Sequence, residues 1–266
     1  MKKIALFILA LTYLGCQSNP ITLDDRDRST MVIDGQTRSF FVRLPGDYSE
    51  TQEYALLLYL HGGGQSAVDV MNLGFTEAGH VLNYIVVYPS GIGGNWFIYD
   101  NTGQGSSDVK YLSTLIDRLI ESYAINSDQV FVSGFSLGGF MSYSLAFAIP
   151  EKLRAISVHS GSVFPEHMPE ELIPLSVQHI HALDDGGIPF EDSQGQVMPV
   201  REVIQNWVEA NGATESLHQI KAEREYQRWE SKDRENTLEL VIFEKGGHQP
   251  FTATPELLFA FFDGLR

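Results

Sequence analysis

Short, almost wholly apolar runs alternate with longer amphipathic segments along most of this chain. The runs at 54–60 and 84–88 lack the alternation of a half-exposed strand, and such runs are typical of strands covered on both faces. Further strands are expected at 129–133, 154–159, 175–181, 226–229 and 238–243. Apolar residues at helical spacing predict helices at 107–123, 139–149, 200–210 and 255–262. Strands that alternate with helices predict an α/β fold with a mostly parallel sheet flanked by helices.

The segment 31–44 has a different pattern, because two strand-like stretches flank Asp34-Gly35. Asp-Gly is typical of the two-residue turn of a β-hairpin, so we expect an antiparallel N-terminal hairpin at the edge of the sheet. The chain has 266 residues, 43% of them hydrophobic, and α/β folds of this size commonly form one domain. We therefore expect a single domain over 29–266.

The N-terminus has the pattern of a signal peptide, expected over 1–15: two lysines, an apolar stretch too short to span a bilayer, and a small residue. Cys16, which follows it, is placed as in the lipobox of bacterial lipoproteins, where the cysteine is acylated. Tyr13 departs from that pattern, so ordinary signal cleavage is the alternative. The polar segment 16–28 is expected to be a tether. These features predict an exported protein that contacts the membrane only through an N-terminal lipid anchor.

Charge and cysteine content narrow the possible partners. The formal net charge is −16, with 34 acidic and 18 basic residues and no basic block, which argues against nucleic acid and anionic membrane surfaces as partners. Cys16 is the only cysteine, so the chain has no intramolecular disulfide and its core must supply its stability. The oligomeric state is left open.

The stretch Gly134-Phe135-Ser136-Leu137-Gly138 lies between an expected strand and an expected helix. That context is typical of a nucleophile elbow, in which a tight turn lifts a serine hydroxyl out of the backbone beside a base. The glycines let neighbouring backbone approach the turn closely. The alternative is a Gly-rich loop that caps a helix, but the strand on one side and the helix on the other favour Ser136 as a nucleophile.

A second Gly-rich stretch, His61-Gly62-Gly63-Gly64, directly follows the apolar run at 54–60. When a serine attacks a carbonyl group, an oxyanion forms, and backbone N–H donors can stabilise it. At this place in the chain, the N–H of Gly63 would pair with that of Leu137 to form an oxyanion hole. His61 is expected to brace the loop, and the alternative is a merely flexible turn.

A serine nucleophile needs a histidine base and an acid that orients it. His248 lies in a Gly-rich loop before the last helix, where an elbow architecture places its base, and it respects the chain order serine, acid, histidine. His80 and His159 compete with it but fit that order poorly. Asp184 and Asp185 both lie between Ser136 and His248 and could each fix the imidazole tautomer, so spacing leaves the acid open.

Metal chemistry has weak support in this sequence. His179 and His181 alternate onto one face of a strand, but they lack a third ligand at a signature spacing. We therefore expect neither a metal nor a cofactor.

Together these motifs resemble the α/β-hydrolase esterases of the polyhydroxybutyrate depolymerase and feruloyl/acetyl-xylan esterase group (carbohydrate esterase family 1). The resemblance begins near Met31 and rests on residues 60–64, 87–91, 95–97, 107–109, 134–139, 180–190 and 246–248. It implies the α/β-hydrolase fold. In that family the acid follows a His-Gly-Thr-x-Asp type stretch, and the matching position here is Asp185.

Departures from the family pattern leave the substrate open. Ala182-Leu183 replace the family's Gly-Thr, Gln249-Pro250-Phe251 replace its aromatic-Pro, and the cysteines common around the Asn-Trp loop are missing. Trp96 and Phe97 either offer a stacking surface to an aryl or sugar group, which would make Trp96 a substrate-binding residue, or anchor their loop by packing inward.

The expected function is that of a serine carboxylesterase acting through Ser136, His248 and Asp185 by way of an acyl-enzyme. Its expected partners are small-molecule esters or the feruloyl and acetyl esters of polysaccharide. The alternatives are a polyhydroxyalkanoate depolymerase-like esterase, an exopeptidase with the same three residues, and a non-catalytic, glycan-binding lipoprotein.

Overall fold

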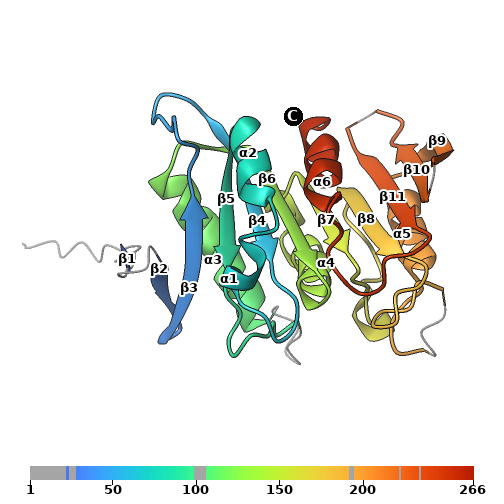
Figure 1. Ribbon diagram of the computed structural model, residues 1–266, viewed down its shortest axis with the longest axis horizontal. Helices are drawn as coiled ribbons and strands as arrows, with labels where there is room; N and C mark the ends of the chain where they lie inside the picture. Colours follow the sequence, from blue (N-terminus) through green and yellow to red (C-terminus); the bar gives the residue numbers. More distant parts are fainter. Residues whose placement is uncertain (1–21, 24–27, 99–105, 192–194, 222, 234) are drawn as a thin grey trace, which may run out of the picture.

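The computed structural model describes residues 22–23, 28–98, 106–191, 195–221, 223–233 and 235–266 (Figure 1). The signal peptide expected over 1–15, Cys16 and most of the expected tether lie outside the described residues. Within the described ranges, no helix combines the length and the apolar character needed to cross a bilayer.

The described residues form one eleven-stranded sheet in the order β1-β2-β3-β5-β4-β6-β7-β8-β11-β10-β9 (Figure 1). Its central strands are parallel to one another, as the apolar runs predict. They are β5 (Tyr84–Pro89), β4 (Tyr54–Leu60), β6 (Ile125–Phe135), β7 (Ala155–His159), β8 (Ser176–Ala182) and β11 (Thr237–Phe243). Because these strands point the same way, the loops that follow them meet at one edge of the sheet.

Both sides of the sheet carry antiparallel strands. On one side, β2 (Ser29–Ile33) and β3 (Gln36–Arg43) form the expected hairpin, and β1 (Thr22–Leu23) pairs with β2. Asp34 and Gly35 turn the hairpin at φ values of 47° and 78°. On the other side, β10 (Arg224–Glu230) pairs with both β11 and β9 (Thr214–Lys221). The sequence pattern misses β9, because this edge strand is mostly exposed and its Leu217 and Ile220 have helical spacing.

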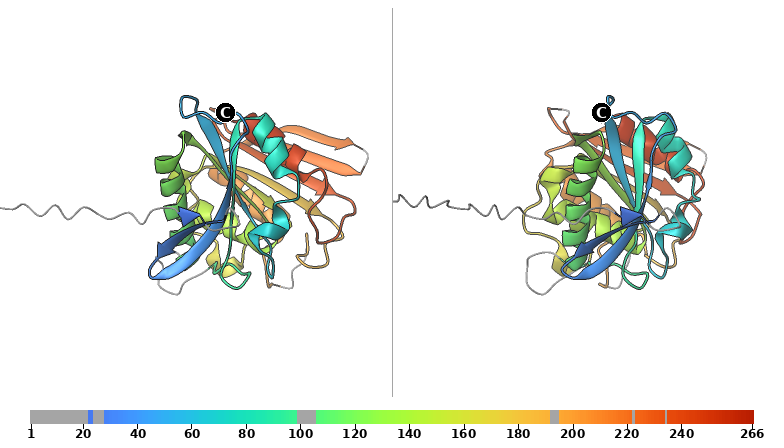
Figure 2. Two further views of the ribbon diagram at one scale, coloured as in Figure 1. Left: turned by 60° about the vertical axis from the view of Figure 1, so that its left-hand side comes forward. Right: turned by 90° about the vertical axis from the view of Figure 1, so that its left-hand side faces the viewer.

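Helices cover both faces of the sheet, with α3 on one side and α2 on the other in Figure 2. One face carries α3 (Ser107–Ser122), α4 (Leu137–Ala148) and α5 (Val200–Ala210), and the other carries α1 (Ala67–Val70), α2 (Phe75–Val81) and α6 (Thr254–Asp263). Short 3₁₀ turns lie at Pro150–Lys152 and Pro165–His167. Leu56 and Leu58 of β4 pack into the first layer, whereas Leu57 and Tyr59 pack into the second. Burial on both faces is the reason that the central strands are apolar throughout.

Several helix boundaries differ from the sequence expectation. Helix α3 ends at Ser122, one residue before the expected end, and Ser106 caps its start: the Ser106 hydroxyl group accepts the N–H of Val109 at 3.2 Å. Helix α4 begins at Leu137, immediately after the elbow serine, and not at 139. The pattern misses α2 because Gly79 interrupts its apolar face; Val86 and Phe259 lie so close to Gly79 that a side chain there would displace them.

Candidate active site

The loops after β6, β8 and β11 bring Ser136, Asp185 and His248 into one hydrogen-bonded row. Ser136 Oγ lies 2.8 Å from His248 Nε2. On the other side of the ring, His248 Nδ1 lies 3.0 Å from Asp185 Oδ1 and 2.9 Å from Oδ2. Residues 112 and 63 positions apart in the chain therefore meet at the carboxyl ends of the parallel strands.

Ser136 occupies a strained turn between β6 and α4. Its φ is 52° and its ψ is −119°, values that a residue with a side chain rarely adopts. A side chain at Gly134 would overlap the carbonyl group of Gly138, and one at Gly138 would overlap that of Leu60. The N–H of Ser136 donates to the carbonyl oxygen of His159 at 2.8 Å, which ties the turn to β7. The strand, turn and helix of a nucleophile elbow are therefore present where the motif predicts them.

The carboxyl group of Asp185 is buried, with 6% of the residue exposed. Its Oδ1 accepts the N–H groups of Gly187 and Ile188, each at 2.8 Å. Burial by itself would raise the pKa of Asp185, but the hydrogen bonds from His248, Ile188 and Gly187 outweigh it and lower the pKa to about 2. An ionised carboxylate can only accept, so Nδ1 of His248 carries the proton. In the neutral ring Nε2 then accepts the proton of the Ser136 hydroxyl group.

Asp184 contacts a different part of the loop that carries His248. Its Oδ1 accepts the N–H groups of Gly246 and Gly247, each at 2.8 Å, just before His248. Of the two aspartates that spacing left open, Asp185 is the one that contacts the imidazole ring.

Behind Asp185, a buried chain of polar side chains runs through Tyr143, His179 and His181. His181 Nε2 donates to the carbonyl oxygen of Ile188 at 2.8 Å and lies 3.5 Å from Asp185 Oδ2. Burial lowers the pKa of His181, so the ring is neutral and its Nδ1 must accept the proton of His179 Nε2, 2.9 Å away. Burial holds the pKa of His179 well below its usual range, so Nδ1 of that ring accepts from the Tyr143 hydroxyl group at 2.8 Å.

Through these hydrogen bonds His179 and His181 support the loop that carries Asp185. Among the described residues, no group of three or more His, Cys, Asp or Glu side chains is arranged to hold a metal ion. Sequence reasoning misses Tyr143, because an apolar helix face gives no sign that one of its aromatic residues bonds to a strand histidine.

The loop after β4 is braced through His61. Its Nε2 accepts the N–H of Gly91 at 2.9 Å, so Nδ1 carries the proton and donates to the carbonyl oxygen of Gly62 at 2.8 Å. Trp96 Nε1 donates to the carbonyl oxygen of His61 at 2.8 Å, and Gly64 donates to Gly94 at 2.8 Å. These bonds confirm the expectation that His61 braces its loop.

Trp96 packs inward and anchors this loop, which is the second of the two roles that the sequence left open for it. Only 4% of Trp96 is exposed, and its ring packs on His61 with 4.8 Å between the ring centroids. A side chain that is covered in this way has no face left on which a substrate ring could stack. Phe97, its neighbour, is 54% exposed.

Arg38 and Asp108 hold the segment 91–97, which follows β5 and braces this loop. They form an ion pair whose side chains are 2% and 0% exposed, and Asp108 Oδ2 accepts the N–H of Phe97 at 2.7 Å. Sequence reasoning misses Arg38, because an arginine in an edge hairpin is usually exposed. The braced loop brings Gly63 beside Leu137: a Cβ atom at Gly63 would lie 3.6 Å from the Leu137 side chain.

A cavity of about 530 Å³ opens onto Ser136. Its walls include the side chains of Leu137, Phe140, Phe164, Ile188, Pro189, Gln196 and Val197, with no charged side chain among the described lining residues. The rings of Phe140 and Phe164 lie 5.0 Å apart between centroids. Such a cavity suits an uncharged group that includes flat, apolar parts.

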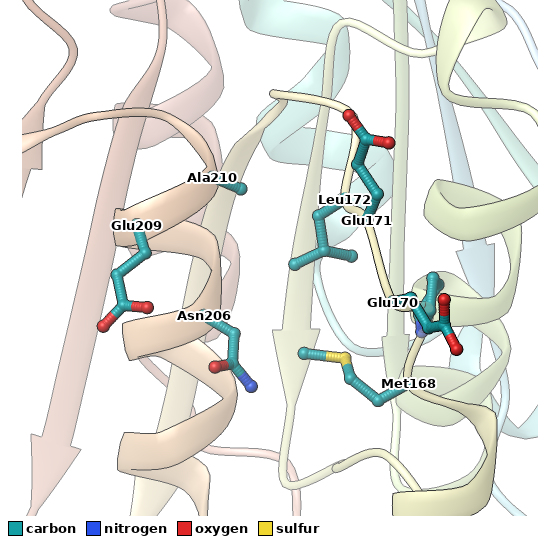
Figure 3. Close-up of a pocket in the computed structure, with 8 residues that line it drawn as sticks. Met168, Glu170, Glu171, Leu172, Asn206, Glu209 and Ala210 are labelled. Atoms are coloured by element: carbon teal, nitrogen blue, oxygen red, sulfur yellow. The ribbon is translucent and has the colours of Figure 1, made fainter.

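A second cavity, of about 480 Å³, lies between α5 and the segment 168–172 (Figure 3). Figure 3 shows Met168 and Leu172 pointing toward α5. Its lining includes Glu170, Glu171 and Glu209 but none of the residues of the hydrogen-bonded row. It is therefore separate from the candidate active site.

Comparison with known proteins agrees with this architecture. A family described as Phospholipase/Carboxylesterase matches residues 100–227. An acetyl xylan esterase from Aspergillus awamori superimposes with a TM-score of 0.67 at 15% identity, over 86% of this chain and 94% of its own. The chain has the α/β-hydrolase fold.

The relatives of this chain by sequence include two kinds of esterase. Feruloyl esterase D of Neurospora crassa is 31% identical over 160 residues, which cover 56% of this chain and 53% of the relative. A bifunctional acetylxylan esterase/xylanase of Neocallimastix patriciarum is 26% identical over 82% of this chain and 32% of its own length. The chain thus matches about half the length of the Neurospora relative. These relatives confirm the resemblance to the feruloyl and acetyl-xylan esterase group.

Proposed function

We propose that this α/β-hydrolase is a serine carboxylesterase that hydrolyses ester groups carried by polysaccharides. The observation that carries the proposal is the row in which Ser136 Oγ lies 2.8 Å from His248 Nε2, beside an uncharged cavity. The esterases among its relatives support the same reaction class.

In the proposed reaction Ser136 Oγ forms a bond to the ester carbonyl carbon while its proton passes to His248 Nε2. Asp185, whose pKa of about 2 keeps it ionised, stabilises the imidazolium through the Nδ1 proton. The N–H groups of Gly63 and Leu137 stabilise the oxyanion.

The tetrahedral intermediate then breaks its bond to the alcohol oxygen, which leaves with the proton of His248 Nε2. Water attacks the resulting acyl-enzyme and gives one proton to the same nitrogen. The acid departs when its bond to Ser136 Oγ breaks, and the proton on His248 Nε2 passes to Ser136 Oγ.

The cavity favours a feruloyl over an acetyl group as the acyl part. An acetyl group has two carbon atoms and would leave most of a cavity of about 530 Å³ empty. An aryl acyl group would place its ring against Phe140 and Phe164, whose tilted rings suit aromatic packing.

The test is a panel of acetyl, feruloyl and hydroxybutyrate esters and dipeptide amides, assayed on a soluble form that starts after Cys16. We expect the feruloyl ester to have the highest kcat/KM, and Ser136→Ala to lower ester turnover by several orders of magnitude, as removal of a serine nucleophile does. Unchanged ester hydrolysis by Ser136→Ala, or amide turnover above ester turnover, would contradict the proposal.

We also propose that the chain is exported and anchored through Cys16. The signal-like segment 1–15 and the cysteine directly after it support this proposal. Expressed in a bacterium, the full chain is expected in the membrane fraction and Cys16→Ala in the soluble fraction. Equal distribution of the two would remove the anchor from the proposal.

A further inference from the structure

Two neighbouring aspartates after β8 hold two parts of one loop. Asp185 contacts the imidazole ring of His248, whereas Asp184 Oδ1 accepts two backbone N–H groups, those of Gly246 and Gly247, each at 2.8 Å. Asp184 itself is exposed and has no part in the proposed proton transfers. Its carboxylate is nevertheless bonded to the backbone that immediately precedes His248.

The two loops leave the sheet side by side. Strands β8 and β11 are parallel neighbours, with Ala182 opposite Phe243, and Leu183 donates its N–H to the carbonyl oxygen of Phe243 at 2.9 Å. Asp184 therefore starts its loop at the point where the chain after β11 turns toward His248. The register of β8 and β11 thus places the Asp184 carboxylate close to the backbone of Gly246 and Gly247.

The turn before His248 is short of side chains that could fix it. Gly247 has a φ of 61°, and a side chain at Gly246 would overlap the Phe251 ring. Both positions thus favour glycine, and a turn built from two glycines is freer than other backbone. Two N–H groups that converge on one oxygen restrain that freedom at the residues next to His248.

We propose that Asp184 is a positioning residue for His248. By holding the backbone at 246–247, its carboxylate keeps the imidazole ring between Ser136 Oγ and Asp185. The proposal rests on the proposed esterase function for its kinetic test. It extends that function by giving the two adjacent aspartates separate tasks, one on the ring and one on the backbone.

The kinetic test compares Asp184→Ala with Asp184→Asn. Because Oδ1 accepts both N–H groups, asparagine keeps the acceptor and loses only the charge. We expect Asp184→Ala to lower kcat by about tenfold or more, since a small misplacement of a catalytic group is costly, with KM changed less than about twofold. Asp184→Asn is expected to retain kcat within about threefold. Asp47→Ala, an exposed aspartate in the turn before β4 at the opposite edge of the sheet, is the matched control.

A second readout needs no substrate. The His248 Nδ1 proton, bonded to Asp185, gives a downfield proton resonance that is assigned by its loss in His248→Gln. We expect this resonance in the wild type and in Asp184→Asn, and its broadening or loss in Asp184→Ala with an unchanged melting temperature.

The two proposals fail in different ways. Wild-type kcat and an unchanged resonance in Asp184→Ala would overturn the positioning role, as would an Asp184→Asn that is as impaired as Asp184→Ala. A wild type that hydrolyses no ester would overturn the esterase function, while the resonance would still test Asp184.

Discussion

Ser136 can adopt its φ of 52° because Gly134 and Gly138, which have no side chains, let the neighbouring backbone approach the turn. Such strain persists only where the surroundings over-determine it, and here two glycines and a bond to His159 do so. The same local logic applies to Asp185, whose ionised form is maintained by three converging donors against the effect of burial. At this scale the site depends on how single polar groups are satisfied.

Tyr143→Phe tests the buried chain behind Asp185. Removal of the hydroxyl group leaves Nδ1 of the buried His179 without a donor, which costs about 1–3 kcal/mol of the free energy of unfolding. The matched control is Tyr59→Phe, because the buried Tyr59 hydroxyl has no hydrogen-bond partner in the described part of the chain. We expect that control to be neutral or stabilising. Urea denaturation of both variants measures the difference, and equal stabilities would show that the chain is not held as described.

At the scale of elements, the site is a meeting of loops that each need support from a neighbour. The Gly-rich loop after β4 is braced by the segment 91–97, which α3 and β3 hold in turn through Asp108 and Arg38. The edge hairpin is thus connected to the candidate oxyanion loop through one buried ion pair. Residues far from Ser136 should therefore affect activity.

Asp108→Asn tests this connection. The amide still accepts the Phe97 N–H, but Arg38 is left as an uncompensated buried charge, which costs about 3–5 kcal/mol of stability. We also expect ester turnover to fall, because the loop that carries Gly63 loses its brace. The control is Lys110→Gln. Lys110 lies on the same helix as Asp108 and forms an exposed ion pair with Asp34, so its loss should cost less than about 1 kcal/mol. Similar losses in the two variants, by thermal melting and ester assay, would contradict the bracing role.

At the scale of the whole molecule, buried histidines link the fold to pH. Burial lowers the pKa of His159 to about 3 and also lowers those of His179 and His181 from 6.5. These rings are neutral in the folded protein and take up protons in the unfolded chain below pH 6.5, so their contribution to stability is full above 6.5 and falls as pH decreases. Asp185, with its pKa lowered from 3.8 to about 2, loses its contribution only between those values.

The melting temperature is therefore expected to begin falling near pH 6.5, well above the range in which Asp185 protonates. His159→Gln should reduce the dependence of the unfolding free energy on pH by about 1.4 kcal/mol per pH unit between about pH 4 and 6, the value for one proton. Denaturant titrations across this pH range measure both slopes. An identical slope in the variant would show that His159 is not neutral in the folded state.

The sequence by itself determined the parallel core, the opening hairpin and the elbow around Ser136. These features are encoded locally: apolar runs report burial on both faces, Asp-Gly reports a tight turn, and Gly-x-Ser-x-Gly between a strand and a helix reports the elbow. Each of these patterns can be recognised in a short stretch of sequence, without information on which residues that stretch contacts.

Spacing left Asp184 and Asp185 open, the family resemblance implied Asp185, and the structure places Asp185 against the ring. Only the tertiary structure decided where Trp96 points and that Arg38 pairs with Asp108. Each depends on where a side chain points relative to residues distant in the chain, and neither spacing nor periodicity carries that direction. For the same reason β9 escaped prediction, since an exposed edge strand is held by backbone pairing with β10 and not by a buried face.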